Sequence, residues 1–196
     1  MLAAIDQALE AAIGWWSAST SFAILAAFLV LVAVALPGRV GVTVLAAFRG
    51  FRDRMPRVLE GVAAVTDADG LQVQGTNVRF AALDAPEFNQ IAKIGEDDDW
   101  INHGLLVKNA LAERIGSRPV HVEVETWDRY GRAVGTVTQD GRDIGEWLVR
   151  QGHAVAAYGD RYREAETHAK RDARGMWGYA KSFDPRFWRH RHKARK

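Results

Sequence analysis

Residues 65–87, VTDADGLQVQGTNVRFAALDAPE, decide the fold of this chain. The stretch holds two short apolar runs and the polar loop that follows them, a pattern typical of strands joined by turns. Similar runs occur on both sides of it, and one of them has valine at every other position. The strand-like runs are residues 62–66, 71–73, 78–83, 120–125 and 133–138. Five short strands are therefore predicted.

Three helical patterns accompany the strands. Residues 106–115 and 144–151 each carry an apolar stripe and are followed by glycine, which favours a helix stop. The third pattern has Asp160 as a candidate N-cap and an apolar stripe over residues 162–176. Together these patterns predict a mainly β protein with α-helices: a small, closed, antiparallel, five-stranded barrel of the OB type with three helices packed on it.

The same central stretch carries charged side chains suited to chemistry. Carboxylates are hard oxygen ligands for calcium or magnesium, and an arginine fork grips a phosphate through two oxygens. The residues concerned are Asp67, Asp69, Arg79, Asp84 and Glu87. Singly, each has an ordinary structural explanation, such as a turn at Asp69–Gly70 or an ion pair for a lone arginine. Together with WDRYGR at residues 127–132, they form the inventory of metal-assisted phosphodiester chemistry.

The order and spacing of these motifs resemble the staphylococcal (thermonuclease) nuclease-like family over most of the chain beyond residue 60. The family pattern runs V-x-D-G-D-T-L, V-R-L-x-x-I-D-A-P-E, D-R-Y-G-R and E-L-V-x-x-G-x-A, and it ends in a helix closing with G-x-W. The matching segments are residues 65–71, 78–87, 128–132, 146–154 and 175–177. Ala68 replaces a glycine and Gly70 a threonine, so no ligand side chain is lost, although the missing hydroxyl could loosen the outer shell of the metal. The resemblance implies an OB barrel with three helices.

The resemblance also implies a metal site. Asp69 and Asp84 would ligate a calcium ion, helped by the backbone carbonyl of Ala85. Glu87 would hold or deprotonate the attacking water, and Asp67 is a secondary candidate. These roles agree with the physical needs of the reaction, which are charge neutralisation, a positioned nucleophile and stabilisation of a five-coordinate transition state.

The substrate-binding residues follow from the same resemblance. Arg79 and Arg132 would bind the scissile phosphate, while Tyr130 and Tyr158 match tyrosines near the bound nucleotide. The expected protein is a monomeric, calcium-dependent, sequence-nonspecific endonuclease that cleaves single-stranded DNA and RNA and leaves 3′-phosphate ends. The alternative is a catalytically inactive, membrane-tethered OB module that binds nucleic acid or a protein partner. Because a binding module needs no calcium ligands, the complete set of charged residues favours the enzyme.

Composition and charge limit the other possibilities. The chain has 196 residues, a formal net charge of +2 and no cysteine, which excludes a disulfide scaffold, a thiolate zinc site and a cysteine nucleophile. Residues 61–185 carry 15 basic and 20 acidic side chains, a net charge of −5, so the basic groups gather at the two ends. If a central domain of this charge handles a polyanion, its charge favours the help of a divalent cation over a basic surface alone.

The N-terminal region predicts a membrane anchor. Residues 15–36 are 22 consecutive uncharged residues, about the 20 that a membrane span requires, and Pro37–Gly38 would end the helix. A cleaved signal peptide and a buried soluble helix are the alternatives, although the first ten residues contain Asp6 and Glu10 and lack the basic groups of a signal peptide. The five arginines that follow the span favour a cytoplasmic catalytic domain, whereas calcium supply and the hazard of a cytoplasmic nuclease favour a secreted or periplasmic one.

The expected organisation follows from these segments. It comprises an N-terminal segment (1–14), a transmembrane anchor (15–37), a basic juxtamembrane linker (38–60), the nuclease domain (61–181) and a basic tail (182–196). The tail is expected to pack briefly and then fray, and it could bind nucleic acid or anionic lipid or serve as a solubilising end. The acidic run at residues 96–99 is interpreted as a solvated loop rather than as a second cation site or a gate against double-stranded substrate.

Overall fold

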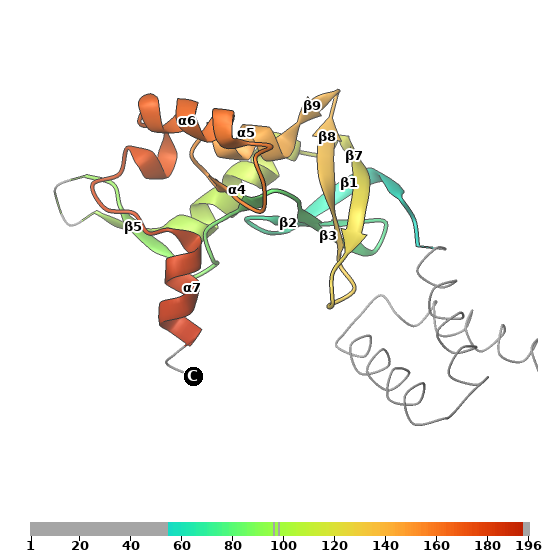
Figure 1. Cartoon of the computed structure of the whole chain (residues 1–196), viewed down its shortest axis with the longest axis horizontal. Helices are drawn as coiled ribbons and strands as arrows, with labels where there is room; N and C mark the ends of the chain where they lie inside the picture. The colour runs from blue at the N-terminus through green and yellow to red at the C-terminus, as the bar shows by residue number, and fades with distance from the viewer. Residues whose placement is uncertain (1–54, 96, 98, 194–196) are drawn as a thin grey trace, which may run out of the picture. The chain divides into compact units, whose positions relative to one another are not determined.

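A computed structural model describes residues 55–95, 97 and 99–193 (Figure 1). The strands are β1 (Val58–Asp67), β2 (Gly70–Val73), β3 (Thr76–Phe80), β4 (Leu83–Asp84), β5 (Ile91–Lys93), β6 (Trp100–Asn102), β7 (Pro119–Trp127), β8 (Ala133–Gln139), β9 (Arg142–Asp143) and β10 (Val155–Ala156). The helices are α4 (His103–Ile115), α5 (Ile144–Arg150), α6 (Arg163–Arg171) and α7 (Pro185–Lys193), with a 3₁₀ turn at Gly175–Trp177.

The sheet closes into a barrel. Among the described residues, its strands follow the order β3-β2-β1-β7-β8-β9, and β3 also pairs with β8, so that five strands form the closed barrel. The pairs β1–β2, β2–β3 and β1–β7 are antiparallel. The closing pair β3–β8 is parallel, with Val78 opposite Ala133. The prediction of a wholly antiparallel barrel was therefore wrong at this one seam, because the two strands that meet there run in the same direction.

Side chains that point inward from every second residue of a strand fill the barrel. Every second residue of β8 is buried, from Ala133 to Gln139, as expected for a strand with one face toward a core. Gly135 permits the close approach of β7, because a Cβ atom at that position would lie 2.1 Å from the carbonyl oxygen of Glu123. The predicted strand at residues 78–83 is divided into β3 and β4, since Ala82 has a φ of +61° and breaks the extended backbone.

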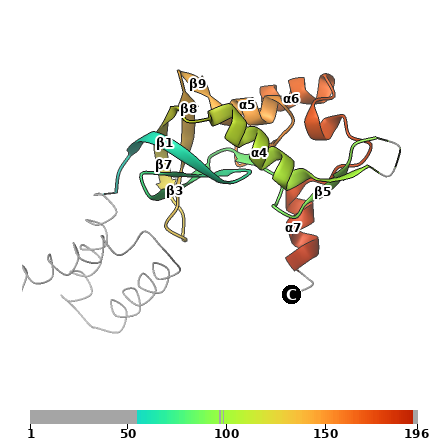
Figure 2. The same cartoon turned by 180° about the vertical axis from the view of Figure 1, so that it is seen from behind.

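Two of the predicted helices are confirmed, and the structure shows the N-caps that begin them. The side chain of Asn102 accepts a hydrogen bond from the Leu105 amide at the start of α4, and Gly116, with a φ of +58°, ends that helix. Asp143 caps α5 by accepting from the Glu146 amide at 3.0 Å. In Figures 1 and 2, α5 and α6 lie side by side, and the N-terminal end of α4 lies beside β5 and α7.

The third helix differs from its prediction. α6 begins after Tyr162. The backbone oxygen of Asp160 accepts from the Arg163 amide, while the Asp160 side chain pairs with the Arg163 guanidinium at 2.8 Å and does not cap the helix. The expected side-chain cap is therefore wrong. The predicted stripe to residue 176 is also interrupted, because α6 ends at Arg171 and Ala173 adopts a φ of +48° before the 3₁₀ turn.

The C-terminal tail is the largest correction. The tail, which was expected to pack briefly and then fray from residue 190 onward, forms the helix α7 over residues 185–193, so the described part of the chain has four α-helices rather than three. The local signal is Asp184–Pro185, since proline is favoured at the first helical position and Asp184 Oδ1 accepts from the Arg186 amide at 2.7 Å.

The predicted N-terminal segments lie outside the described residues. This applies to residues 1–14, to the anchor at 15–37 and to residues 38–54 of the linker, while β1 begins at Val58 within the predicted linker. None of the described helices has the length and apolar character needed to cross a bilayer.

Candidate active site

Asp84 is the centre of the candidate site. It is the last residue of β4, which pairs with β10 so that Asp84 lies opposite Val155, and its side chain is 0% exposed. Its Oδ2 atom is bound by Arg189. Its Oδ1 atom accepts no hydrogen bond from any described residue and lies 3.5 Å from Nη2 of Arg79. A buried carboxylate oxygen in this state is electrostatically costly unless a cation approaches it.

Arg79 joins the two predicted metal ligands. The antiparallel register of β2 and β3 places Gly70 opposite Arg79, which brings Asp69 beside the guanidinium. Nη2 of Arg79 lies 2.6 Å from Asp69 Oδ2 and 3.5 Å from Asp84 Oδ1. The backbone oxygen of Asp69 also accepts from the Phe80 amide at 3.1 Å. The structure therefore brings Asp69, Arg79 and Asp84 together, as the sequence predicts.

The loop after Asp84 is held by Gln90, a residue that the sequence analysis missed. Gln90 is fully buried; its Oε1 accepts from the Glu87 amide at 3.2 Å, and its amide donates to the Glu87 carbonyl at 2.8 Å. Its Nε2 donates to the Phe183 carbonyl, and its backbone oxygen accepts from the His103 amide at 2.8 Å. Gln90 thus fixes the loop carrying Glu87 against the start of α4 and the segment before α7.

Gly104 brings α4 against the same loop. A Cβ atom at residue 104 would lie 1.9 Å from the carbonyl oxygen of Glu87 and 2.9 Å from Cα of Phe88. Only glycine allows this approach, so the first turn of α4 forms part of the support for Glu87. No sequence motif in the analysis pointed to Gly104, because the constraint comes from a loop at another point in the chain.

Three further residues predicted for the site are Asp67, Ala85 and Tyr158, and each has its own contacts. Asp67 is half-buried at the end of β1 and accepts from the Ala68 amide at 2.8 Å, a turn-stabilising role. Ala85 is buried beside Asp84. Tyr158 is 74% exposed with a φ of +57°, and the guanidinium of Arg186 lies 6.0 Å from its ring centre.

Arg132 and Tyr130 belong to the loop between β7 and β8. Asp128 Oδ2 accepts from Nε of Arg132 at 2.8 Å, and Asp128 Oδ1 accepts from the Tyr130 amide at 2.8 Å. Tyr130 is 63% exposed, and the guanidinium of Arg132 lies 5.5 Å from its ring centre. The DRYGR motif therefore builds a loop in which Asp128 orients Arg132.

Arg189 of α7 is the main contact that sequence reasoning did not find. Its Nη1 lies 2.6 Å from Glu87 Oε1, and its Nη2 is bound to Asp84 Oδ2. These partners are 102 and 105 residues away in the chain. Burial by itself would lower the pKa of the Arg189 guanidinium, but the hydrogen bonds to Asp84 and Glu87 outweigh it and raise that pKa above its usual value.

The donor set fits a hard divalent cation. Oδ1 of Asp84, which accepts no hydrogen bond from a described residue, and the carboxylate of Asp69 both approach one nitrogen of Arg79, so a single cation could reach both. In the part of the chain that the structure describes, no three acidic or histidine side chains converge into a complete metal cage. Backbone carbonyls and water would supply the remaining ligands, as calcium and magnesium permit.

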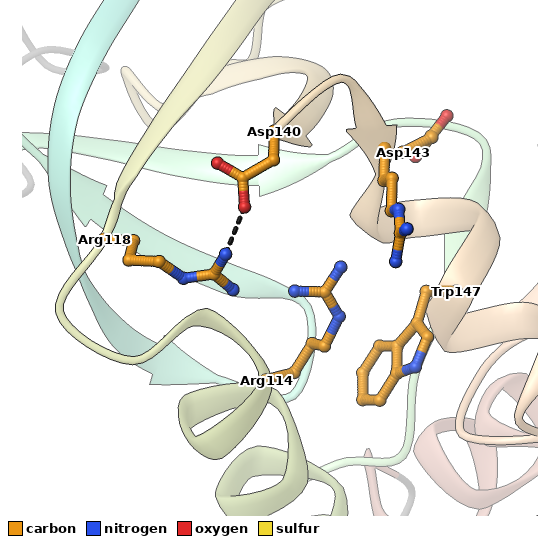
Figure 3. Close-up of a pocket in the computed structure, with 6 residues that line it drawn as sticks. Arg114, Arg118, Asp140, Asp143 and Trp147 are labelled. Atoms are coloured by element: carbon orange, nitrogen blue, oxygen red, sulfur yellow. Dashed lines mark hydrogen bonds and ion pairs between the residues drawn. The ribbon is translucent and has the colours of Figure 1, made fainter.

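A separate pocket of about 530 Å³ is lined by Arg114, Arg118, Asp140, Arg142, Asp143 and Trp147 (Figure 3). Arg118 pairs with Asp140, and Arg114 donates to Gln139 at 3.0 Å while its guanidinium faces the Trp147 ring. Since Asp143 caps α5, most of the charged groups in this pocket already stabilise the fold.

The OB-type barrel carries a cluster of carboxylates and arginines, the residue types that metal-assisted phosphodiester chemistry uses. A sequence profile described as "Staphylococcal nuclease homologue" matches residues 77–179, more than half of the chain. The chain belongs to the staphylococcal nuclease homologue family, and the resemblance inferred from the sequence is confirmed.

Individual relatives agree with this assignment. The succinoglycan biosynthesis protein ExoI of Rhizobium meliloti is 36% identical over 122 residues, covering 60% of this chain and 63% of that protein. An uncharacterized endonuclease of Escherichia coli O157:H7 is 28% identical over 141 residues, covering 66% of this chain and 84% of that protein. A probable endonuclease, LCL3, of Pyricularia oryzae is 31% identical over 144 residues, covering 66% and 54%. The chain therefore spans less than two thirds of the first and third of these relatives.

Proposed function

We propose that this protein is a calcium-dependent endonuclease that hydrolyses phosphodiester bonds of single-stranded DNA and RNA and leaves 3′-phosphate ends. The observation that carries the proposal is the buried Asp84, which shares the guanidinium of Arg79 with Asp69 and keeps one oxygen without a hydrogen bond from the described residues. The match to a nuclease family and the endonuclease names of several relatives support the same activity.

The proposed roles follow from the chemistry of each group. Asp69, Asp84 and the carbonyl of Ala85 would hold the calcium ion, which when bound supplies positive charge beside the scissile phosphate. Glu87 positions the attacking water and takes its proton, a role that depends on its place in the loop. Arg79 and Arg132 bind phosphate oxygens and gain strength as charge builds up in the five-coordinate transition state.

Base discrimination should be weak. Tyr130 and Tyr158 are exposed aromatic rings that can stack on any base, and arginine contacts to phosphate do not depend on sequence. Single-stranded substrate is favoured because stacking on such rings needs an unpaired base.

The test uses the full chain with single-stranded DNA and RNA in calcium and then in excess chelator. Cleavage should require calcium and leave 3′-phosphate ends, which phosphatase treatment followed by mass spectrometry identifies. Asp84→Asn should weaken calcium binding about 10-fold or more and lower cleavage with it, since a neutral amide replaces a charged oxygen. Asp140→Asn, an exposed aspartate on the β8–β9 turn, is the matched control. Nucleic-acid binding without cleavage at any calcium concentration would instead support the inactive OB module.

We further propose that residues 15–37 anchor the protein in a membrane. The support is the uncharged stretch in the sequence. The protein should then stay in the membrane pellet after a carbonate wash, and mass spectrometry should find residues 1–36 on the mature chain. A mature N-terminus near Leu36 would contradict the anchor and indicate a secreted or periplasmic protein. The positive-inside rule favours a cytoplasmic catalytic domain, which protease protection in sealed vesicles would reveal.

A further inference from the structure

We propose that α7 is an intramolecular inhibitor of the active site, in which the Arg189 guanidinium competes with the divalent cation for Asp84 and also occupies Glu87. This inference rests on the proposed function, because it concerns the same carboxylates. It differs in assigning a regulatory role to a helix that lies beyond the matched family segment, which ends at residue 179.

Arg189 places its positive charge on carboxylates of the proposed active site. One guanidinium nitrogen binds Oδ2 of Asp84, and another lies 2.6 Å from Oε1 of Glu87. A second arginine of α7, Arg186, places its Nε 3.9 Å from the same Asp84 oxygen. The helix therefore directs two positive groups at a buried carboxylate that the proposed mechanism needs for calcium.

Several further contacts hold α7 in this position. Trp188 donates from Nε1 to Asn89 Oδ1 at 3.3 Å, and its ring centre lies 5.4 Å from that of Phe183. The Phe183 carbonyl accepts from Gln90, whose other bonds hold the Glu87 loop. The helix is thus attached to the same loop that carries Asn89 and Glu87.

Charge balance makes Arg189 and the cation competitors. Asp69, Asp84 and Glu87 supply three negative charges, which Arg79 and Arg189 already compensate in part. Adding a divalent cation with Arg189 still in place would bring two positive groups onto the single buried carboxylate of Asp84, where repulsion is strong. Binding of the cation and docking of α7 should therefore oppose each other, and by linkage each weakens the other equally.

The helix α7 also approaches a residue that is proposed to bind substrate. Arg186 lies over the ring of Tyr158, one of the two tyrosines proposed to stack on a base. A nucleic acid strand would offer phosphates to the same arginines, so substrate and calcium should both favour release of α7.

The experiment measures calcium binding to the full chain by calorimetry, with calcium chloride as the only ligand. Arg189→Ala should bind calcium about 5- to 150-fold more tightly than the wild type, the usual range for coupled sites. Arg189→Lys keeps the charge and loses the two-pronged geometry, so its affinity should fall between the two. Arg191→Ala is the matched control, because Arg191 is on the same helix, exposed, and its guanidinium faces Phe187.

Hydrogen exchange gives a second readout that does not depend on activity. In the wild type, calcium should accelerate amide exchange in α7 while that in α5 stays unchanged, and in Arg189→Ala the α7 amides should exchange rapidly without calcium. Equal calcium affinities for wild type, Arg189→Ala and Arg191→Ala, with α7 exchange insensitive to calcium, would overturn the competition. So would a failure of every variant to bind calcium. Tighter binding by Arg189→Ala without cleavage by any variant would uphold the competition and refute the nuclease.

Discussion

At the scale of single residues, arginines connect or orient the charged groups proposed for catalysis. Arg79 connects Asp69 with Asp84, Arg189 connects Asp84 with Glu87, and Arg132 is oriented by Asp128. Arg132 and Arg189 each use two guanidinium nitrogens, a fork that a lysine ammonium cannot reproduce, whereas Arg79 reaches both of its carboxylates through Nη2. Geometry at this scale therefore matters as much as charge.

Arg132→Lys should separate geometry from charge. We expect kcat to fall about 10²- to 10³-fold, because the contact with the developing negative charge is lost, while affinity for single-stranded DNA changes much less. Steady-state kinetics in calcium and a binding titration measure the two quantities, and thermal melting checks the fold. Arg129→Lys, in the same loop, serves as the comparison. Wild-type turnover by Arg132→Lys would remove Arg132 from the catalytic assignment.

At the scale of elements, the site depends on how α4 and the loop after β4 meet. The first turn of α4 contacts the backbone of Glu87 through Gly104, and Gln90 bonds to both segments. Glu87 is therefore positioned by the first turn of α4 and by Gln90, neither of which belongs to the motif residues on β2 and β3.

Gly104→Ala should impair catalysis through this contact. A methyl group 1.9 Å from the Glu87 carbonyl cannot be accommodated, so the loop must shift. We expect a loss of kcat of about 10²-fold, since a displacement near 1 Å of a catalytic group has effects of this size. Leu105→Ala, at the exposed neighbouring position, is the control for changes in α4 itself. Unchanged kcat in Gly104→Ala would show that the loop position does not limit the reaction.

At the scale of the whole molecule, the packing of α4 creates a sensitivity to acid. His103 is 0% exposed, its two ring nitrogens have no hydrogen-bond partner among the described residues, and the Tyr179 ring lies edge-on at 5.4 Å. Burial, reinforced by the nearby charge of His153, lowers the pKa of His103 from 6.5 to about 4. Burial lowers the pKa of His153 as well.

The sign of the pH effect follows from these pKa values. Below pH 6.5 the unfolded chain binds a proton at His103 that the folded chain refuses until about pH 4, so the folded state loses stability as the pH falls through this window. The full loss from His103 is about 3 kcal/mol. Urea unfolding between pH 7 and pH 4.5 should show this slope in the wild type and a smaller one in His103→Leu and His103→Gln. An equal slope in all three proteins would contradict the assignment.

Local sequence patterns were sufficient for much of the barrel and for the motif residues. Alternating valines, short apolar runs, apolar helix stripes and glycine stops depend on neighbours within one or two turns, and they predicted β1, β2, β7, β8, α4 and α5. The proximity of Asp69 to Arg79 also follows from a local hairpin, because β2 and β3 are adjacent in the chain.

Tertiary structure decided what depends on residues far apart in the chain. Three such contacts are the parallel pairing of β3 with β8, the contact of Gly104 with Glu87 and the pairing of Arg189 with Asp84. No local pattern in the sequence indicates which of these segments meet. The tail illustrates the reason. The basic sequence HRHKARK by itself predicts a solvated end. Residues 185–193 nevertheless form a helix, and Arg189 of this helix binds the buried carboxylate of Asp84, which is 105 residues away in the chain. The sequence by itself determined which groups could perform the chemistry, and the long-range packing determined which charges those groups meet.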